Sequence, residues 1–150
     1  MKRIVSIILI VLMVYSFVAC SGTVIATHTA EQIVEELKSS GMPITNVVVY
    51  NETTDPNGLL GRPHQYTSKV NFSDPAHKDA DIASPDNTVE VFQYADDAWK
   101  RANVVRDVTK SMPASAEYVY QVSFYVLRLN HDILPEDAAK YEEAFKAIIG

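Results

Sequence analysis

The order of helix-like and strand-like segments constrains the fold of this chain more than any other feature. Apolar residues recur at helical spacing in three segments, and β-branched or aromatic residues dominate four others. The predicted helices cover residues 29–40, 95–112 and 135–149, and the predicted strands cover residues 44–50, 66–72, 88–94 and 117–129. Because strands and helices do not alternate strictly, this order disfavours a doubly wound parallel sheet. We predict an α+β fold in the order α-β-β-β-α-β-α. Its helices pack on one face of a four-stranded sheet that is mainly antiparallel, or mixed.

Local patterns indicate the ends of the first helix and the faces of one strand. Thr29 begins the helix and Gln32 follows three residues later, which is the spacing of a capping box. Gly41 and Pro43 end it. In the strand at residues 66–72 larger apolar residues alternate with polar ones, which predicts one buried face and one face in contact with water.

The N-terminal segment has the composition of an export signal. Lys2 and Arg3 precede an apolar stretch over residues 4–19, which is shorter than the ~20 residues of a transmembrane helix. The stretch leads into FVAC at residues 17–20, which resembles a bacterial lipobox. In that motif the cysteine thiol receives a diacylglyceryl group and becomes the new N-terminus.

This interpretation divides the chain into three parts. Residues 1–19 are a lipoprotein signal peptide, residues 20–28 are the lipidated Cys20 and a short tether, and residues 29–150 are a single α+β domain. Acyl chains on Cys20 would bind the lipid bilayer and hold the domain on the extracytoplasmic face of the cell membrane. An uncleaved anchor with an incidental cysteine is the alternative.

Composition disfavours several classes of protein. Apolar residues make up 47% of the 150 residues, which is enough for a globular core and too much for a disordered chain. Without Lys2 and Arg3 the chain has 11 basic and 19 acidic residues, a net charge of −8. Such a surface repels phosphate backbones, so nucleic acid is not an expected partner. A single cysteine also rules out an intrachain disulfide.

The stretch GLLGRPHQYTSKVNF, residues 58–72, is the best candidate for a ligand site. Its polar and cationic side chains could hydrogen bond to a ligand, and the ligand-binding residues that we predict are Arg62, Gln65, Tyr66 and Lys69. The alternative is a structural role. In that interpretation Gly61 and Pro63 shape the approach to a strand, Arg62 bonds to backbone carbonyls and Tyr66 packs in the core. The sequence supports both interpretations.

Three longer stretches follow one another between Gly41 and Tyr141 and beyond: GMPITNVVVYNETTDPNGLLGRPHQYTSKVNF, TVEVFQYADDAWKRANVV and EYVYQVSFYVLRLNHDILPEDAAKYEEAF. Together they resemble a group of uncharacterised bacterial lipoproteins. The most distinctive piece is the GRPxQYTSK motif at residues 61–69. The resemblance implies a lipid-anchored domain on the cell surface, and it implies no activity, ligand or fold.

We expect neither a metal site nor a cofactor. The sequence DPNG at residues 55–58 begins like a calcium loop, but two leucines follow where further oxygen ligands belong. His77, Asp79 and Asp81 could hold a cation in a loop, although such short acidic clusters are common on solvated surfaces.

The chain contains the residue types of a hydrolase but lacks a nucleophile-elbow motif. The candidates are Ser68, His64, His131 and Asp132. Because Asp132 precedes a helix, local backbone bonds explain it as well as catalysis does. We therefore assign no catalytic residue, and a cell-envelope hydrolase that uses His64 or His131 is an alternative function.

The function that we expect is binding of a protein partner or an envelope component. Tyrosines could provide a stacking surface if they lie together on an open face of the sheet. Those on or beside predicted strands are Tyr50, Tyr66, Tyr94, Tyr118, Tyr120 and Tyr125. A second alternative is an inhibitor or immunity-type protein that presents the polar loop at residues 73–87 to an enzyme.

Overall fold

The computed structural model describes residues 25–75, 85–112 and 116–150. The predicted signal peptide, Cys20 and the first part of the tether lie outside these residues. His77, Asp79 and Asp81 also lie outside them, together with most of the loop at residues 73–87. None of the helices in the described ranges has the length and apolar character that a membrane span requires.

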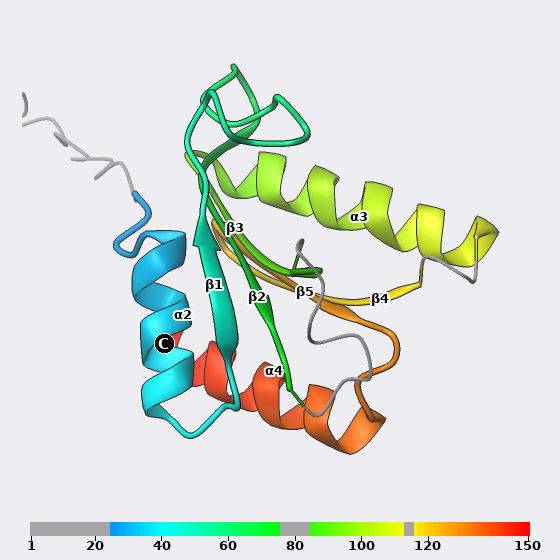
Figure 1. Ribbon diagram of the computed structural model, residues 1–150. Coiled ribbons are helices and arrows are strands. Elements are labelled where there is room, and N and C mark those ends of the chain that lie inside the picture. Colours follow the sequence, from blue (N-terminus) through cyan, green and yellow to red (C-terminus); the bar gives the residue numbers. More distant parts are fainter. Residues whose placement is uncertain (1–24, 76–84, 113–115) are drawn as a thin grey trace, which may run out of the picture.

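The described residues form three helices and one five-stranded sheet (Figure 1). The elements are α2 (Ala30–Ser39), β1 (Thr45–Val49), β2 (Tyr66–Ser73), β3 (Asn87–Phe92), α3 (Ala95–Ser111), β4 (Glu117–Val122), β5 (Tyr125–Asn130) and α4 (Pro135–Ile149). The strands lie in the order β1-β2-β3-β5-β4, and every neighbouring pair is antiparallel. The predicted α+β class and antiparallel sheet are therefore confirmed.

The prediction of four strands is wrong, because residues 117–129 form a hairpin instead of one long strand. Val122 of β4 lies opposite Tyr125 of β5, so the turn between them consists of Ser123 and Phe124. Ser123 has a φ of 48°, the left-handed conformation that a two-residue hairpin turn requires at its first position. Glycine or asparagine usually marks such a turn, and the sequence Ser-Phe carries no such signal.

We expect Ser123→Gly to raise the free energy of unfolding by about 0.5 kcal/mol, because glycine adopts a positive φ without the steric cost that a Cβ imposes. The gain is reduced by the larger backbone entropy of glycine in the unfolded chain. Equilibrium unfolding in urea measures the difference. Ser123→Ala keeps the Cβ and is the control, so an equal gain from alanine would contradict the explanation.

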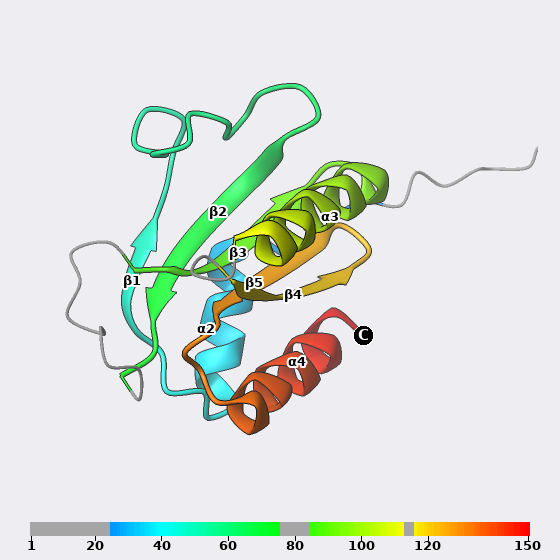
Figure 2. The same ribbon diagram turned by 90° about the vertical axis from the view of Figure 1, so that its right-hand side faces the viewer.

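Helices cover both faces of the sheet, so the prediction that they pack on one face is wrong (Figure 2). α2 and α4 pack on the face from which Val70, Val91 and Leu127 project. α3 packs on the opposite face, where Ala98 and Ala102 join a smaller cluster with Tyr66, Phe92 and Val126. An amphipathic pattern shows that a helix has a buried side, but not which face of a sheet that side meets.

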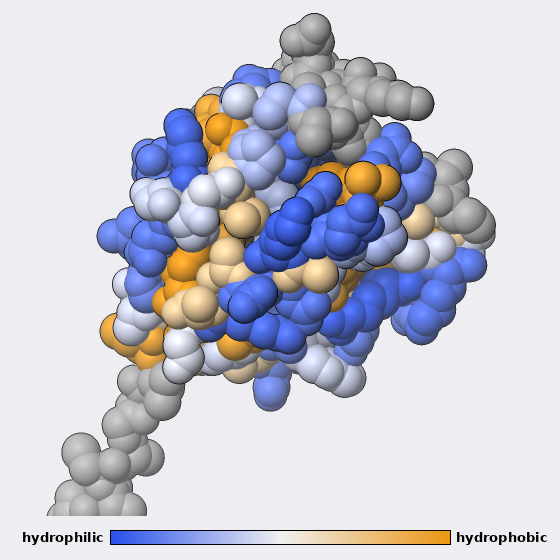
Figure 3. All heavy atoms as spheres, turned by 90° about the horizontal axis from the view of Figure 1, so that it is seen from below, coloured by the Kyte–Doolittle hydropathy of each residue, from blue (hydrophilic) through white to orange (hydrophobic). Residues whose placement is uncertain are grey.

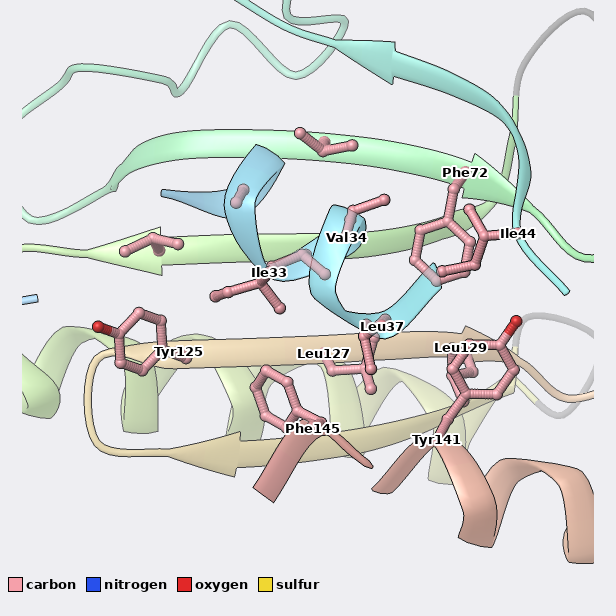
Figure 4. Packing of buried hydrophobic residues seen from close by; sticks show 14 of the residues in the cluster. Ile33, Val34, Leu37, Ile44, Phe72, Tyr125, Leu127, Leu129, Tyr141 and Phe145 are labelled. Atoms are coloured by element: carbon pink, nitrogen blue, oxygen red, sulfur yellow. The ribbon is translucent and has the colours of Figure 1, made fainter. Parts of the chain in front are cut away.

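The larger core lies between the sheet and the pair of helices α2 and α4 (Figure 4). Ile33 and Leu37 of α2 meet Leu127 of β5 and Phe145 of α4, and all four side chains are fully buried. Each fully buried side chain of this kind contributes about 1.5–3 kcal/mol. This core therefore provides stability that a smaller domain would obtain from disulfides.

The polar face of β2 is largely buried, so the prediction that this face contacts water is wrong beyond Thr67. The side chain of Lys69 is only 3% exposed and reaches the loop that contains Asp55. Asn71 donates a hydrogen bond to the carbonyl oxygen of Pro85 at 2.7 Å. The loop and the segment at Pro85 thus cover polar groups that strand alternation alone would place in water.

The capping box of α2 is confirmed. The backbone N–H of Gln32 donates to the Thr29 hydroxyl at 3.2 Å, and the backbone N–H of Thr29 donates to the Gln32 side-chain oxygen at 2.8 Å. These two bonds satisfy N–H groups that the first turn of a helix would otherwise leave unpaired.

The residues that precede α2 are attached to the end of the sheet that carries the β4–β5 hairpin. The backbone N–H groups of Thr27 and His28 donate to the Tyr125 hydroxyl at 2.7 and 3.2 Å. The His28 ring also meets the Tyr125 ring edge-on, with 6.4 Å between the centroids. The described chain therefore begins at this end of the molecule.

β1 forms one edge of the sheet, and its pairing with β2 is irregular. Thr45 lies opposite Ser73 and Val48 lies opposite Asn71, so β1 contains one residue more than β2 over this interval. Asn46 has a φ of 45° within this bulge, a conformation that asparagine tolerates better than most residues. The bulge interrupts the regular row of backbone hydrogen-bonding groups on β1.

Candidate functional site

The loop between β1 and β2 is organised around the buried carboxylate of Asp55. This carboxylate accepts hydrogen bonds from the backbone N–H groups of Leu59 and Leu60 at 2.9 and 3.1 Å. It also accepts bonds from the Tyr66 hydroxyl at 2.7 Å and from Lys69 Nζ at 2.8 Å. Asp55, Tyr66 and Lys69 are called the Asp55 cluster below. The cluster joins the loop to β2.

The ionisation of the Asp55 cluster follows from these contacts. Burial alone raises the pKa of Asp55, but the bonds from Lys69, Tyr66 and the two backbone amides outweigh burial and hold this pKa well below its usual range. Burial and the neighbouring carboxylate raise the pKa of Tyr66, so its hydroxyl stays a neutral donor. Lys69 Nζ also lies 4.8 Å from the centre of the Tyr50 ring, a cation–π contact.

The four predicted ligand-binding residues fall into two pairs. Tyr66 and Lys69 are buried in the Asp55 cluster, so they can influence a ligand only through the loop that they hold. Arg62 is exposed and Gln65 is half-buried, and both line a groove at the surface. A direct ligand-binding role for Arg62 and Gln65 remains a prediction.

The groove lies between residues 61–67 and the start of α3, and its volume is about 360 Å³. Its polar lining includes Arg62, His64, Gln65, Thr67, Gln93 and Tyr94. A second hollow of about 360 Å³ lies along α3 and reaches Lys100, Arg101 and Val104. His64, Gln65 and Asp97 line both hollows, so the groove extends along the helix.

The side chains of His64 and Asp97 meet between the two walls of the groove. His64 Nδ1 lies 3.1 Å from Asp97 Oδ2, and Lys100 Nζ lies 3.3 Å from Asp97 Oδ1. Asp97 is buried in the first turn of α3, where the helix dipole favours a carboxylate. His64 is exposed, and its contact with Asp97 leaves Nε2 available to solvent or a ligand. The φ of His64 is 62°, a strained value of the kind that often occurs at functional sites.

Four charged side chains connect α3 to the face of the sheet that it covers. They are called the Glu90 network and are Glu90, Arg101, Glu117 and Arg128. Arg101 donates two bonds to Glu90, both at 2.9 Å, and Arg128 donates a third at 3.1 Å. Arg128 also donates two bonds of 2.6 Å to Glu117. Burial lowers the pKa of Arg128, but the bonds and charges of Glu117 and Glu90 outweigh burial and raise this pKa. The network holds α3, and thus the second wall of the groove, against the sheet.

The other catalytic candidates do not join His64. Ser68 points toward α2, where its hydroxyl accepts a bond from the backbone N–H of Ala30 at 3.0 Å. His131 Nε2 lies 3.1 Å from Asp132 Oδ1, just before α4. These residues therefore form no Ser-His-Asp triad. Among the residues that the structure describes, no cluster of His, Cys, Asp or Glu is suited to hold a metal ion.

The tyrosines do not share an open face of the sheet. Tyr66 and Tyr125 are buried, and Tyr118 and Tyr120 are half-buried against the larger core. Tyr94 is 51% exposed and lines the groove. The predicted stacking surface of several tyrosines is therefore absent from the described strands, and one exposed tyrosine ring, that of Tyr94, lies beside the candidate site.

The sequence indicated one wall of the groove and missed the other. Residues 61–67 are adjacent in the chain and carry a visible polar motif. Tyr94 and Asp97 lie at a strand end and in the acidic first turn of a helix, where such residues are ordinary. Nothing in the spacing connects Asp97 with His64, which is 33 residues away.

Comparisons with protein-family models, with curated proteins and with solved structures find no match to this chain.

Proposed function

We propose that this protein is a lipid-anchored binding module on the extracytoplasmic face of the cell membrane. Its groove would bind a protein partner or an envelope component. The observation that carries the proposal is a groove of polar side chains on a loop that the buried Asp55 cluster fixes in place. Polar groups held in position by a rigid support lose less entropy on binding than mobile groups do.

The chemistry of the groove favours an extended polar ligand, such as a peptide or glycan segment. Arg62 offers donors only, whereas Gln65 and Gln93 offer both donors and acceptors. The exposed ring of Tyr94 adds an apolar face on which a sugar or a side chain can stack. A small apolar ligand would instead require an enclosed and mostly apolar cavity.

Photo-crosslinking in the native membrane tests this function. A photoreactive amino acid replaces Gln65 in the groove or, as the control, Ala139 on the exposed side of α4. We expect an adduct at position 65 that is absent at position 139, and mass spectrometry then identifies the partner. Equal labelling at both positions would contradict a specific groove.

We expect Arg62→Ala to weaken this binding by roughly tenfold, because an exposed cation at the edge of a binding site contributes about 1–1.5 kcal/mol. The yield of the position-65 adduct at limiting partner concentration measures the loss. The melting temperature should not change, since Arg62 lies outside the Asp55 cluster. An unchanged yield would remove Arg62 from the site.

The His64–Asp97 pair favours a second candidate function, a cell-envelope hydrolase. Asp97 orients the imidazole so that Nε2 can act as a general base toward water. In the described residues no hydrogen bond joins His64 to a serine, so water would be the nucleophile. Release of p-nitrophenol from p-nitrophenyl acetate tests this candidate. A general base accelerates a reaction by about 10²–10⁴-fold, so equal rates for the wild type and His64→Gln would exclude it.

A further inference from the structure

We propose that the end of the molecule that carries the groove rests on the bilayer, with Trp99 in the headgroup region and Tyr94 at the border between the groove and the lipid. This orientation depends on the lipid anchor at Cys20 that is part of the proposed function. Beyond the proposed function, the orientation specifies which surface faces the membrane and which residues contact it.

The attachment of the N-terminal residues determines which end lies near the anchor. Thr27 and His28 are bonded to Tyr125 beside the β4–β5 hairpin. The backbone N–H of Phe92, at the end of β3, donates to the carbonyl oxygen of Phe124 in this hairpin at 2.8 Å. The hairpin, the end of β3 and the start of α3 therefore lie together, and β2 begins beside them because Tyr66 pairs with Phe92.

The length of chain before the domain limits how far this end can lie from the bilayer. Ile25 lies five positions after Cys20 in the chain, and at 3.3–3.6 Å per position this distance is at most about 18 Å. Figure 1 shows the residues before α2, the loop after β1 and the start of α3 in the upper part of the view, whereas α4 lies at the bottom. The anchor thus holds the upper end closer to the membrane than the end with α4.

Exposed aromatic side chains at this end suit the headgroup region. Tyr94 precedes α3 and Trp99 lies about one turn into it, and they are 51% and 57% exposed. Side chains on a helix lean toward its N-terminus, so Trp99 leans toward the groove end. Tyrosine and tryptophan favour the membrane interface because they combine an apolar ring with a polar group.

The charges at this end suit a zwitterionic bilayer. Arg62 and Lys100 are exposed here, and so are Glu52 and Asp96, so neither sign predominates. The underside of the molecule, which is opposite to the groove end, has a mixed surface on which hydrophilic areas alternate with apolar ones (Figure 3). In this orientation the groove opens close to the membrane surface, so its ligand is met there.

The chain has a single tryptophan, Trp99, whose fluorescence reports on this end directly. The full-length lipidated protein is reconstituted into phosphatidylcholine vesicles with or without bromine on the acyl chains near the headgroups. We expect the emission to shift to shorter wavelength and to lose most of its intensity in the brominated vesicles. Flotation of the same samples reports on the anchor separately.

A matched control moves the tryptophan to the opposite end. The variant Trp99→Phe with Leu134→Trp places it at the N-cap of α4, where Leu134 is also 57% exposed. Its emission should stay that of a ring in water and should resist the bromine. Equal quenching at both positions, or a floating protein with unquenched Trp99, overturns the orientation and leaves the anchor intact. A protein that does not float overturns the anchor and the orientation with it.

Discussion

Asp55→Asn is expected to lower the free energy of unfolding by about 3–5 kcal/mol, since it removes one partner of a buried ion pair. The substitution preserves the shape of the side chain but leaves the ammonium of Lys69, only 3% exposed, without its counter-charge. Equilibrium unfolding in urea at pH 7 measures the loss. Amide hydrogen exchange should also accelerate over residues 56–66, because Leu59 and Leu60 bond to the same carboxylate.

The pH dependence of this loss checks its electrostatic origin. Because the pKa of Asp55 is lower in the folded than in the unfolded protein, its ionisation stabilises the fold fully above the unfolded value of about 3.9. As the pH falls below that value, the contribution is lost progressively. The difference between the wild type and Asp55→Asn should thus be constant from pH 7 to about 5 and shrink in stronger acid.

The double variant Asp55→Asn with Lys69→Met is the control for the unpaired charge. Methionine has a similar length and needs no counter-charge, so we expect it to recover a large part of the lost stability. A double variant as unstable as Asp55→Asn alone would mean that the backbone bonds of Asp55, and not the ion pair, account for the loss.

Glu90→Gln is expected to destabilise the protein by a similar amount, about 3–5 kcal/mol. The substitution removes a buried negative charge that pairs with two guanidinium groups beneath α3. The Glu90 side chain is completely buried and receives two bonds from Arg101 and one from Arg128. The midpoint of urea unfolding measures this effect. Exchange should accelerate along α3, in contrast to the loop response expected for Asp55→Asn.

Glu142→Gln on α4 is the matched control for Glu90→Gln. Glu142 pairs with Lys146 one helical turn away, and both side chains reach the solvent. Such pairs contribute about 0.3–0.5 kcal/mol, so the expected loss is close to the error of the measurement. Comparable losses from both substitutions would show that burial does not control the strength of the Glu90 network.

The sequence predicted the fold class and most elements because their periodicities are local. The capping box at Thr29 and Gln32 needs only neighbouring residues, and the strands at β2 and β3 combine β-branched residues with turn signals at their ends. The hairpin at Ser123 was missed because its turn uses a strained serine. The position of α3 was missed because its choice of face depends on partners far away in the chain.

The site was predicted in part for the same reason. The motif around Arg62 and Gln65 is contiguous, so its polar character is visible in the sequence. Strand alternation places Lys69 on the face that was expected to contact water, and only the tertiary contact with Asp55 shows that it is buried. Glu90 follows the same pattern, since alternation in β3 places it on a face that would be solvated without α3. Buried charge is a long-range property that single-sequence periodicity does not report.

The bulge in β1 has a consequence for crowding. If the proposed lipid anchor holds the protein on a membrane, its copies meet at high effective concentration. An unbroken, flat border strand would invite neighbours to continue the sheet from one copy to the next. The extra residue beside Asn46 disrupts the alignment of backbone N–H and C=O groups that pairing with a strand of a second copy requires. Dense packing on a surface is therefore compatible with a population of separate molecules.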